Sequence, residues 1–364
     1  MYNEFQVNKA NPNEYRIVEA ELKALGEGEV RLKVDQFAFT ANNLTYAAAG
    51  DSLGYWQFFP ALDNADKSWG IIPVWAFADV VESNIDAIPV GDRLYGYFPP
   101  ATSVVIEPSH ISANALVDNS QHRQKLPPLY NRYNRVLADS NYDRSTDAAR
   151  ILLAPLHMTS FCIWDQLKSN NYYNAEQVII VSASSKTSLG LAYGLSTDDN
   201  APTVVALTSS RNVDFVSGLG LYQETVVYNS LAETLQNKPS VIIDMAGNAA
   251  VKAELHDTLG DNLNYYISVG ITHWEDLDGS AFTEKTDPNK QEMFFAPSYI
   301  LERMKEWGPS EFDKRSSGFV IGAAMATFGW MTIDQRNGLD GLTKLYPAAC
   351  KGELPPSSGV VIKM

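Results

Sequence analysis

One stretch of the sequence, residues 178–194, limits the possible folds more than any other, and it reads VIIVSASSKTSLGLAYG. Its first four residues, Val178 to Val181, form a β-branched run that is typical of a strand buried on both faces of a parallel sheet. After a short polar turn, apolar residues recur at helical spacing, at Leu189, Leu191, Ala192 and Leu195. The stretch therefore predicts a strand, a turn and a helix whose positive dipole end favours an anion.

The turn in this stretch matches neither of two familiar phosphate-binding patterns. Dinucleotide-binding turns read GxGxxG, and triphosphate loops read GxxxxGK followed by Ser or Thr. Ser182 to Ser185 stand where glycines are expected, and only Lys186 and Thr187 match the end of a triphosphate loop. Because Ile180, six residues before Lys186, belongs to the strand, the turn is too short to wrap a triphosphate. A turn that binds nothing remains open, as does a dinucleotide site in which hydroxyls and Lys186 replace glycine contacts.

Composition restricts the class of partner. The formal charge of −15 argues against nucleic-acid binding, which needs clustered Lys and Arg, so the expected partner is a small molecule. The two cysteines, Cys162 and Cys350, are too few for a zinc site or a disulfide framework and predict a reduced, cytoplasmic protein. No stretch approaches the roughly 18 apolar residues of a membrane span, and residues 1–15 lack the apolar centre of a signal peptide.

The N-terminal part of the chain predicts β-structure. Residues 15–20 and 29–39 alternate apolar and polar side chains, which is typical of a half-buried antiparallel sheet. Residues 74–81, the segment after Gly91 and residues 103–106 add short strands separated by Gly and Pro, and together they predict a small barrel.

The middle of the chain leads from this barrel to the nucleotide-type pattern. Residues 117–146 are polar and indicate an inserted excursion or a linker. Asp143 or Ser145 is expected to cap a helix that begins near Asp147, and a second helix is expected over residues 159–167.

From Val178 onward, strands and helices alternate. Further strands are expected over residues 203–207, 225–228, 241–243 and 265–269. Such alternation predicts an α/β fold with a doubly wound parallel sheet. The last residues, 358–364, are β-like again and are expected to return to the barrel, which gives two domains: residues 1–150 with 336–364, and residues 151–335.

This order of parts resembles the medium-chain dehydrogenase/reductase superfamily, in its zinc-independent quinone oxidoreductase and enoyl reductase branch. The resemblance implies a GroES-like β-barrel domain that carries the substrate chemistry and a Rossmann-like dinucleotide-binding domain. The serine-rich SASSKT turn is similar to that of a DUF2855-like subfamily. The matching segments are TANNLTYA (40–47), VGDRLYGY (90–97), LHMTSF (156–161), VIIVSASSKTSLGLA (178–192), LTSSRNVDFVSGLGL (207–221), VIIDMAG (241–247) and YYISVG (265–270).

The chain also departs from that superfamily. With two cysteines it cannot supply the ligands of the zinc-dependent members. The glycines of the phosphate turn are missing, so the cofactor is expected to bind weakly or differently. A glycine-rich PxxxGxExxG segment is replaced by GIIPVWAFADVV, whose bulky side chains are expected to reshape the substrate cleft.

The resemblance implies NADP(H) as the cofactor. Arg211 and two serines follow the second nucleotide strand, where an acid would favour NAD and a cation accommodates a 2′-phosphate; a plain surface charge is the alternative for Arg211. Thr159 is expected near the nicotinamide, or as a helix cap, and Asp244 as a structural acid or, less in keeping with the short turn, a metal-organising one. The expected cofactor residues are Thr159, Ser184, Ser185, Lys186, Thr187, Ser209, Ser210, Arg211, Ala246, Gly247 and Gly270.

The same resemblance places the catalytic groups in the N-terminal part. Hydride transfer to an activated alkene or a quinone needs at most a donor for the developing enolate charge, and Tyr46, Tyr55 and Asn42, with Asn43, lie where the superfamily places such groups. Hydrophobic packing is the alternative for the tyrosines, and His157 and His273 are expected to be ordinary core or surface residues. The leading hypothesis is a zinc-independent NADP(H)-dependent reductase, possibly a homodimer; the rival is a non-catalytic relative that binds another anionic small molecule.

Overall fold

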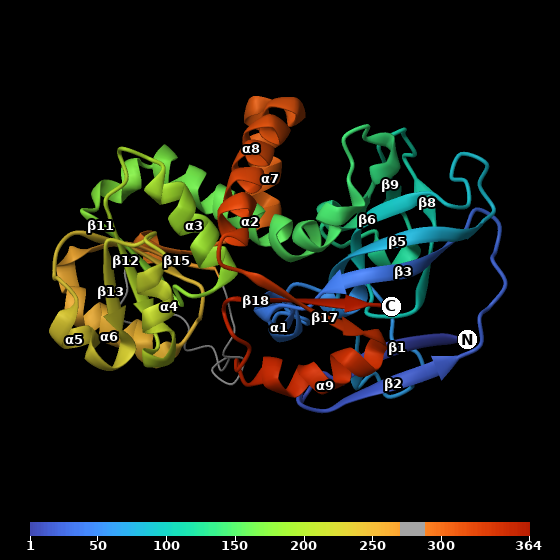
Figure 1. Cartoon of the computed structure of the whole chain (residues 1–364), viewed down its shortest axis with the longest axis horizontal. Coiled ribbons are helices and arrows are strands. Elements are labelled where there is room, and N and C mark those ends of the chain that lie inside the picture. Colours follow the sequence, from blue (N-terminus) through green and yellow to red (C-terminus); the bar gives the residue numbers. More distant parts are fainter. Residues whose placement is uncertain (270–287) are drawn as a thin grey trace. The chain divides into compact units, whose positions relative to one another are not determined.

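The computed structural model describes residues 1–269 and 288–364, which belong to two compact units (Figure 1). Unit 1 comprises Met1–Leu152 and Thr332–Met364, and unit 2 comprises Leu153–Met331. None of the helices in the described ranges is long and apolar enough to cross a membrane.

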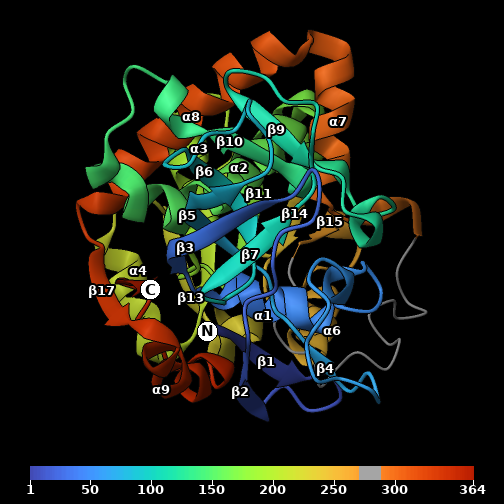
Figure 2. The same cartoon turned by 90° about the vertical axis from the view of Figure 1, so that its right-hand side faces the viewer.

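Unit 1 is built on β-sheets that are mainly antiparallel (Figure 2). In the larger sheet the strand order is β17-β18-β3-β5-β6-β10-β9-β8, with β7 also paired to β3, and β2-β1-β4 form a smaller sheet. The strands are β1 (Tyr2–Asn8), β2 (Tyr15–Ala20), β3 (Val30–Ala38), β4 (Trp69–Gly70), β5 (Val74–Ser83), β6 (Arg93–Phe98), β7 (Ser103–Ile106), β8 (Pro108–Ser109), β9 (Ala115–Asp118), β10 (Arg132–Arg135), β17 (Thr332–Asn337) and β18 (Ser358–Lys363). Helices α1 (Ala41–Ala48) and α9 (Gly338–Cys350) complete the unit.

The C-terminal strand returns to the N-terminal sheet, as the sequence predicts. Strand β18 pairs antiparallel with β3, with Val361 opposite Ala38 and Ile362 opposite Phe37. Strand β17, which pairs parallel with β18, was not expected, because its residues are mostly exposed and polar and do not alternate. An edge strand of this kind is held by backbone pairing more than by burial.

Unit 2 contains one six-stranded parallel sheet in the order β13-β12-β11-β14-β15-β16. Its strands are β11 (Gln177–Val181), β12 (Thr203–Thr208), β13 (Glu224–Val227), β14 (Ser240–Asp244), β15 (Leu263–Ser268) and β16 (Gln291–Met293). Its helices are α2 (Asp147–Ser169, which begins in unit 1), α3 (Lys186–Ser196), α4 (Val213–Gly218), α5 (Leu231–Thr234), α6 (Ala249–Leu259), α7 (Ala296–Trp307) and α8 (Pro309–Phe328).

Alternate side chains of β11 enter different cores, which confirms the predicted doubly wound sheet. Val178 and Ile180 pack in a cluster with residues of α2, α3 and α8, whereas Ile179 and Val181 pack with residues of α5 and α6. Figure 1 shows α3 and the α5–α6 pair on opposite sides of the strands. Because both faces of the sheet are covered, Val178 to Val181 are all apolar, and this pattern allowed the strand to be predicted from the sequence.

The expectation of separate helices before β11 is wrong. One helix, α2, runs through Pro155 from Asp147 to Ser169. A proline inside a helix costs about 3 kcal/mol, whereas each buried large apolar side chain contributes about 1.5–3 kcal/mol. Leu152, Leu153, Phe161, Ile163 and Leu167 are all buried along α2, so packing outweighs the proline.

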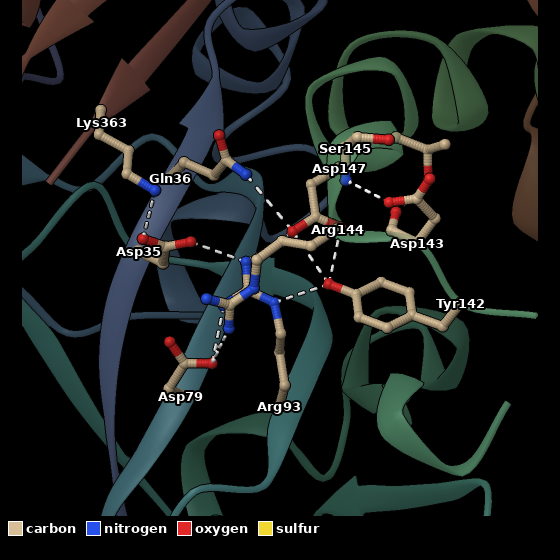
Figure 3. Close-up of polar contacts among 11 residues, drawn as sticks. Asp35, Gln36, Asp79, Arg93, Tyr142, Asp143, Arg144, Ser145, Asp147 and Lys363 are labelled. Carbon is tan, nitrogen blue, oxygen red and sulfur yellow. Dashed lines mark hydrogen bonds and ion pairs between the residues drawn. The ribbon is translucent and has the colours of Figure 1, made fainter. Parts of the chain in front are cut away.

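A buried guanidinium ties the elements of unit 1 together (Figure 3). Arg93 on β6 has no exposed side-chain surface and contacts three carboxylates: Asp35 at 2.7 Å, Asp79 at 2.7 Å and Asp147 at 2.6 Å. Its Nε donates to the Tyr142 hydroxyl at 2.8 Å, and this hydroxyl in turn donates to Asp147. The arginine therefore links β3, β5, β6 and the first turn of α2, where a carboxylate also suits the helix dipole.

Two further cations balance the charge of this group. Lys363 on β18 pairs with Asp35 at 2.7 Å, and Arg144 approaches Asp79 at 3.5 Å. Burial acts to raise the pKa of Asp35, but hydrogen bonds from Lys363 and Arg93 outweigh it and hold this pKa below its ordinary value. A lowered folded-state pKa stabilises the fold above the unfolded-state pKa, and that contribution is lost as the pH falls through the folded-state value.

Replacing Arg93 with Met should destabilise unit 1 by about 3–5 kcal/mol at pH 7, because the buried Asp147 and the partly buried Asp35 and Asp79 lose their shared partner. The difference from the wild type should begin to shrink as the pH falls below about 4, the ordinary Asp pKa, and the contribution of Asp35 should be lost as the pH falls through its lowered folded-state pKa. Urea unfolding between pH 3 and pH 8 measures both effects.

Arg336→Met is the matched control, since it removes an exposed arginine that pairs with Asp334 on the same unit. It should leave the unfolding midpoint nearly unchanged. A loss in Arg93→Met that is no larger than in the control, or that does not vary with pH, would contradict the assigned role.

Candidate functional site

The serine-rich turn lies at the carboxyl end of β11, at the centre of the parallel sheet. In sheets of this order, ligands bind where the strand order reverses, outside the carboxyl ends of the strands. Ser185 caps α3, since its Oγ accepts from the N–H of Ser188 at 3.1 Å, and the Ser188 hydroxyl donates to the carbonyl of Ser182 at 2.9 Å. Lys186 and Thr187 then form the first turn of α3, whose N–H groups have no acceptor within the helix.

Two tyrosines hold the turn in a conformation that usually requires glycine. Ser182 has φ of 62°, in the left-handed region, and its N–H donates to the Tyr228 hydroxyl at 3.0 Å. The Tyr222 hydroxyl donates to the carbonyl of Ala183 at 2.7 Å. Side-chain hydrogen bonds thus stabilise a backbone shape that a glycine would adopt without help.

Lys186 is partly buried at the start of α3. Desolvation lowers the pKa of its ammonium group to about 8, because burial disfavours the charged form. An anion at this position would raise that pKa again. His157, on α2, is fully buried, and desolvation lowers its pKa to about 4, so it is neutral at neutral pH, in keeping with its interpretation as a core residue.

The loop after β12 meets this turn. Asn212 donates through its side-chain amide to Ser184 Oγ at 3.0 Å, which brings the first and second strand ends together. Ser209 Oγ is buried and has no hydrogen-bond partner among residues 1–269 and 288–364, while Ser210 and Arg211 are exposed. A buried hydroxyl without a partner is unfavourable unless a ligand or water completes it.

The third strand end, after β14, is organised by Asp244. One carboxylate oxygen accepts from the N–H groups of Ala246 at 2.8 Å and Gly247 at 3.0 Å, and the other accepts from the Tyr266 hydroxyl at 2.7 Å. These bonds support the structural role expected for Asp244. Gly247 has φ of 70°, which glycine adopts readily. Gly270 lies outside the described residues.

Thr159 lies in the middle of α2, so it does not cap the helix. Its hydroxyl donates to the carbonyl of Pro155, one turn earlier, at 3.2 Å. The neighbouring Ser160 donates to the carbonyl of Thr187 at 2.7 Å and fixes α2 against the turn. Close contact of α2 with α3 depends on Gly190, where an added Cβ would lie 2.6 Å from Ser160 Oγ and 2.7 Å from the His157 ring.

The expected catalytic tyrosines lie together in unit 1. Tyr46 on α1 and Tyr55 in the short helix Tyr55–Gln57 are buried, with ring centroids 4.6 Å apart. Trp75 Nε1 donates to the Tyr46 hydroxyl at 3.2 Å, and Asn42 also contacts this hydroxyl. Burial raises the pKa of both phenols, so both are neutral donors at neutral pH.

Asn43 does not belong to this group. Its side chain accepts from the N–H of Thr40 at 2.7 Å and donates to the carbonyl of Pro73 at 2.9 Å, so it caps α1. Conversely, sequence reasoning missed Trp75, Tyr97 and Tyr130, which adjoin Tyr46 and Tyr55. The aromatic alternation on β5 and β6 was a usable signal for the first two; Tyr130 lies in the segment interpreted as an excursion.

The residues at the strand ends fit the phosphates of a dinucleotide. Lys186 and Arg211 supply cations, α3 supplies a helix N-terminus, and Ser209 supplies an incompletely bonded hydroxyl. Between Thr208 and Asn212 the sequence carries no acidic side chain that would oppose a 2′-phosphate. In the described part of the chain, no group of three or more His, Cys, Asp or Glu side chains is arranged to hold a metal ion.

A family model matches the sequence, and several solved proteins share the fold. A family model described as "Protein of unknown function (DUF2855)" matches residues 37–355. CurA from Vibrio vulnificus, solved with NADPH, superposes with a TM-score of 0.61 at 10% identity, covering 100% of this chain and 99% of that one. Mycobacterial Rv1454c complexed with NADPH gives 0.58 at 14% identity, with 100% of both chains covered.

The quinone oxidoreductase from Coxiella burnetii gives a TM-score of 0.55 at 14% identity, covering 100% of this chain and 99% of that one. No curated protein matches the sequence. At these identities the likeness concerns the fold, and it bears out the predicted combination of a β-rich domain with a Rossmann-type domain.

Replacing Gly190 with Ala should loosen the packing of α2 on α3 and destabilise unit 2 by about 1–3 kcal/mol, because the new methyl group overlaps Ser160 and His157. Gly318→Ala on α8 is the control, since nothing lies within 4 Å of its added Cβ and alanine favours a helix by up to about 1 kcal/mol. Thermal unfolding of both variants tests this, and equal midpoints would contradict it.

Proposed function

The chain belongs to the DUF2855 family, and within it we propose that this protein is a zinc-independent, NADP(H)-dependent oxidoreductase that reduces an α,β-unsaturated carbonyl or a quinone. The observation that carries the proposal is the capped turn at the carboxyl end of β11, with Lys186 at its helix start, at the centre of the parallel sheet. Solved proteins of the same fold have NADPH bound.

In this proposal unit 2 binds the cofactor. The start of α3 and Lys186 hold the pyrophosphate, and Ser209, Ser210 and Arg211 hold the 2′-phosphate that distinguishes NADP(H) from NAD(H). The Ser184 hydroxyl, fixed by Asn212, closes the same edge. When bound, the cofactor supplies the hydride.

Unit 1 supplies the substrate chemistry. Hydride addition to an enone or a quinone leaves negative charge on the carbonyl oxygen, and neutral hydrogen-bond donors stabilise that charge as it develops. Tyr46, Tyr55 and Asn42 are the proposed donors. A phenol is suited to this role because its pKa, raised by burial, keeps it protonated at neutral pH, so it can donate a hydrogen bond or a proton.

One observation favours a second candidate, a non-catalytic protein that binds another anionic small molecule. The serine side chains of the turn are engaged with one another and with Asn212, and they occupy space that glycines would leave for a pyrophosphate. A smaller anion would still reach the start of α3.

Arg211→Ala should weaken NADPH binding at least tenfold and leave NADH binding nearly unchanged, because only NADPH carries the 2′-phosphate; a charge-assisted contact contributes about 1.5–3 kcal/mol. Lys186→Ala should weaken both cofactors if Lys186 contacts the pyrophosphate. Calorimetric titration of each variant with both cofactors gives the four affinities.

Arg315→Ala is the control, because this exposed arginine on α8 pairs with Glu311 in the same helix and lies over the Trp307 ring of α7, away from the strand ends that carry Lys186 and Arg211. Equal losses for NADPH and NADH in Arg211→Ala would show that Arg211 is structural. Absence of wild-type binding to either cofactor at millimolar concentration would overturn the proposal, and NADPH binding without turnover of enones or quinones would favour the non-catalytic candidate.

A further inference from the structure

The Tyr46 hydroxyl is the meeting point of polar side chains from separate elements of unit 1. We call this group the Tyr46 cluster. It consists of Asn42 on α1, Trp75 on β5, Tyr97 on β6, Tyr130 in the short helix Pro128–Asn131, and Tyr46 itself. Elements that are distant in sequence are thus combined around one oxygen atom.

The ring packing directs the hydroxyls inward. Tyr97 meets Tyr46 edge-on, with centroids 5.4 Å apart and planes at 85°, and Tyr130 does so at 6.4 Å and 79°. Trp75 Nε1 donates to Tyr46 Oη at 3.2 Å, and the hydroxyls of Tyr55 and Tyr130 lie 3.3 Å apart. Such edge-on contacts are the favoured arrangement of aromatic pairs, so the packing and the polar convergence support each other.

Tyr97 has an unusual place in the cluster. Its side chain is fully buried, and its hydroxyl has no hydrogen-bond partner within the described residues. Its ring packs edge-on against that of Tyr46, but its hydroxyl makes no hydrogen bond to the Tyr46 hydroxyl. A buried hydroxyl left in this state is unfavourable for folding alone, which points to a role at the Tyr46 oxygen.

The segment around Tyr130 is held firmly, although it reads as an excursion in the sequence. Arg123 is fully buried and donates to the carbonyl of Tyr130 at 2.7 Å, to Asn131 Oδ1 at 2.9 Å and to the Tyr133 hydroxyl at 2.7 Å. Its charge is balanced by Asp118 at 2.8 Å. Burying a guanidinium carries a desolvation cost, which these partners offset. The same contacts fix the backbone of the segment that carries Tyr130.

The phenols of the cluster are not equivalent. Burial raises the pKa of Tyr46, but hydrogen bonds from Trp75, Asn42 and Tyr130 oppose that rise. For Tyr97 and Tyr130, burial and the neighbouring phenols act in the same direction. The donors therefore favour release of the proton from Tyr46 over its release from the other two.

The remaining titratable groups near the cluster are Tyr55, Tyr95 and two arginines. Tyr55 contacts Tyr46 and Tyr130, while Tyr95 stacks on Trp75 with centroids 5.6 Å apart. Arg150 lies over the Tyr95 ring at 4.5 Å, and the positive charge of Arg123 acts on Tyr97. A phenol ring therefore lies between each arginine and Tyr46.

We propose that Tyr46 is the proton donor of the reduction and that Trp75 and Tyr130 are positioning residues that orient and polarise its hydroxyl, while the Tyr97 ring packs edge-on against that of Tyr46. This inference rests on the proposed reductase function. In the step, the substrate accepts a hydride that NADPH would supply and becomes an enolate or, from a quinone, a hydroquinone anion; the O–H bond of Tyr46 breaks and its proton passes to that anion. The electron pair stays on the phenolate, which the surrounding donors stabilise until solvent returns a proton.

The first test measures Tyr46 directly and needs no turnover. A fluorinated tyrosine, whose phenol is more acidic than that of tyrosine, is placed at position 46, and its ¹⁹F resonance is followed against pH. Tyr130→Phe and Trp75→Phe should each raise the pKa of the labelled phenol by about one unit, because each removes a donor to the phenolate. Both changes keep an aromatic ring, so the packing is retained.

Tyr95→Phe is the matched control, since it removes a phenol on the same strand as Tyr97 that does not donate to Tyr46. It should leave the titration unchanged. An unaltered titration in both Tyr130→Phe and Trp75→Phe would overturn the positioning role, whether or not the protein reduces any substrate.

The second test is kinetic. With a substrate that the wild type reduces, Tyr46→Phe should lower kcat at least about 100-fold, the usual contribution of general acid catalysis. Tyr130→Phe should lower kcat about tenfold with little change in KM, and adding it to Tyr46→Phe should cause no further loss, because it acts through Tyr46.

The outcomes of the two tests are separable. Additive losses in the double variant, or a larger loss in Tyr55→Phe than in Tyr46→Phe, would overturn the assignment of the proton donor. A wild type that binds NADPH but reduces no enone or quinone would remove the proposed function, while the ¹⁹F titration would still decide whether the cluster tunes Tyr46.

Discussion

A buried positive charge needs compensation, and in unit 1 the side chain of Arg93 imposes that need on its surroundings. Asp35, Asp79 and Asp147 meet it from two strands and the first turn of α2, and Lys363 joins from the C-terminal strand. Without Arg93, the buried carboxylate of Asp147 would lose its cation in a low-dielectric interior. The N-terminal sheet, the returning C-terminus and the start of the long helix are therefore bound to one another by a single electrostatic requirement.

The phosphate turn shows a different solution to a constraint that glycine usually meets. Ser182, at the end of β11, has a left-handed backbone conformation, and hydrogen bonds with two tyrosines hold the adjoining peptides. The turn is then built from side chains rather than from the freedom of the backbone. Its serines are committed to internal bonds, whereas Lys186 and the loop that contains Ser209 remain as the groups suited to an anion.

The sequence predicted the parts whose signal is local. The β-branched strands of unit 2 and the returning strand β18 were legible because burial on one or both faces sets their composition. The interrupted α2 was mistaken because the penalty of Pro155 is local, while the packing that outweighs it comes from other elements. Strand β17 has no hydrophobic pattern that would predict it. The position of Tyr130 depends on its contacts with Arg123 and Tyr55. Contacts between residues far apart in sequence cannot be predicted from the spacing of residue types.

The bond between Ser182 and Tyr228 also limits how this chain can change over generations. While position 182 is serine, loss of the Tyr228 hydroxyl removes a hydrogen bond that stabilises the left-handed backbone conformation of Ser182. Once position 182 is glycine, which adopts this conformation without strain, the hydroxyl is dispensable. Substitution at the two positions without loss of stability therefore has one order: Ser182 is replaced by glycine first, and Tyr228 is replaced afterwards. A lineage that takes the reverse order must pass through a less stable protein, so the serine-rich turn is easier to keep than to abandon.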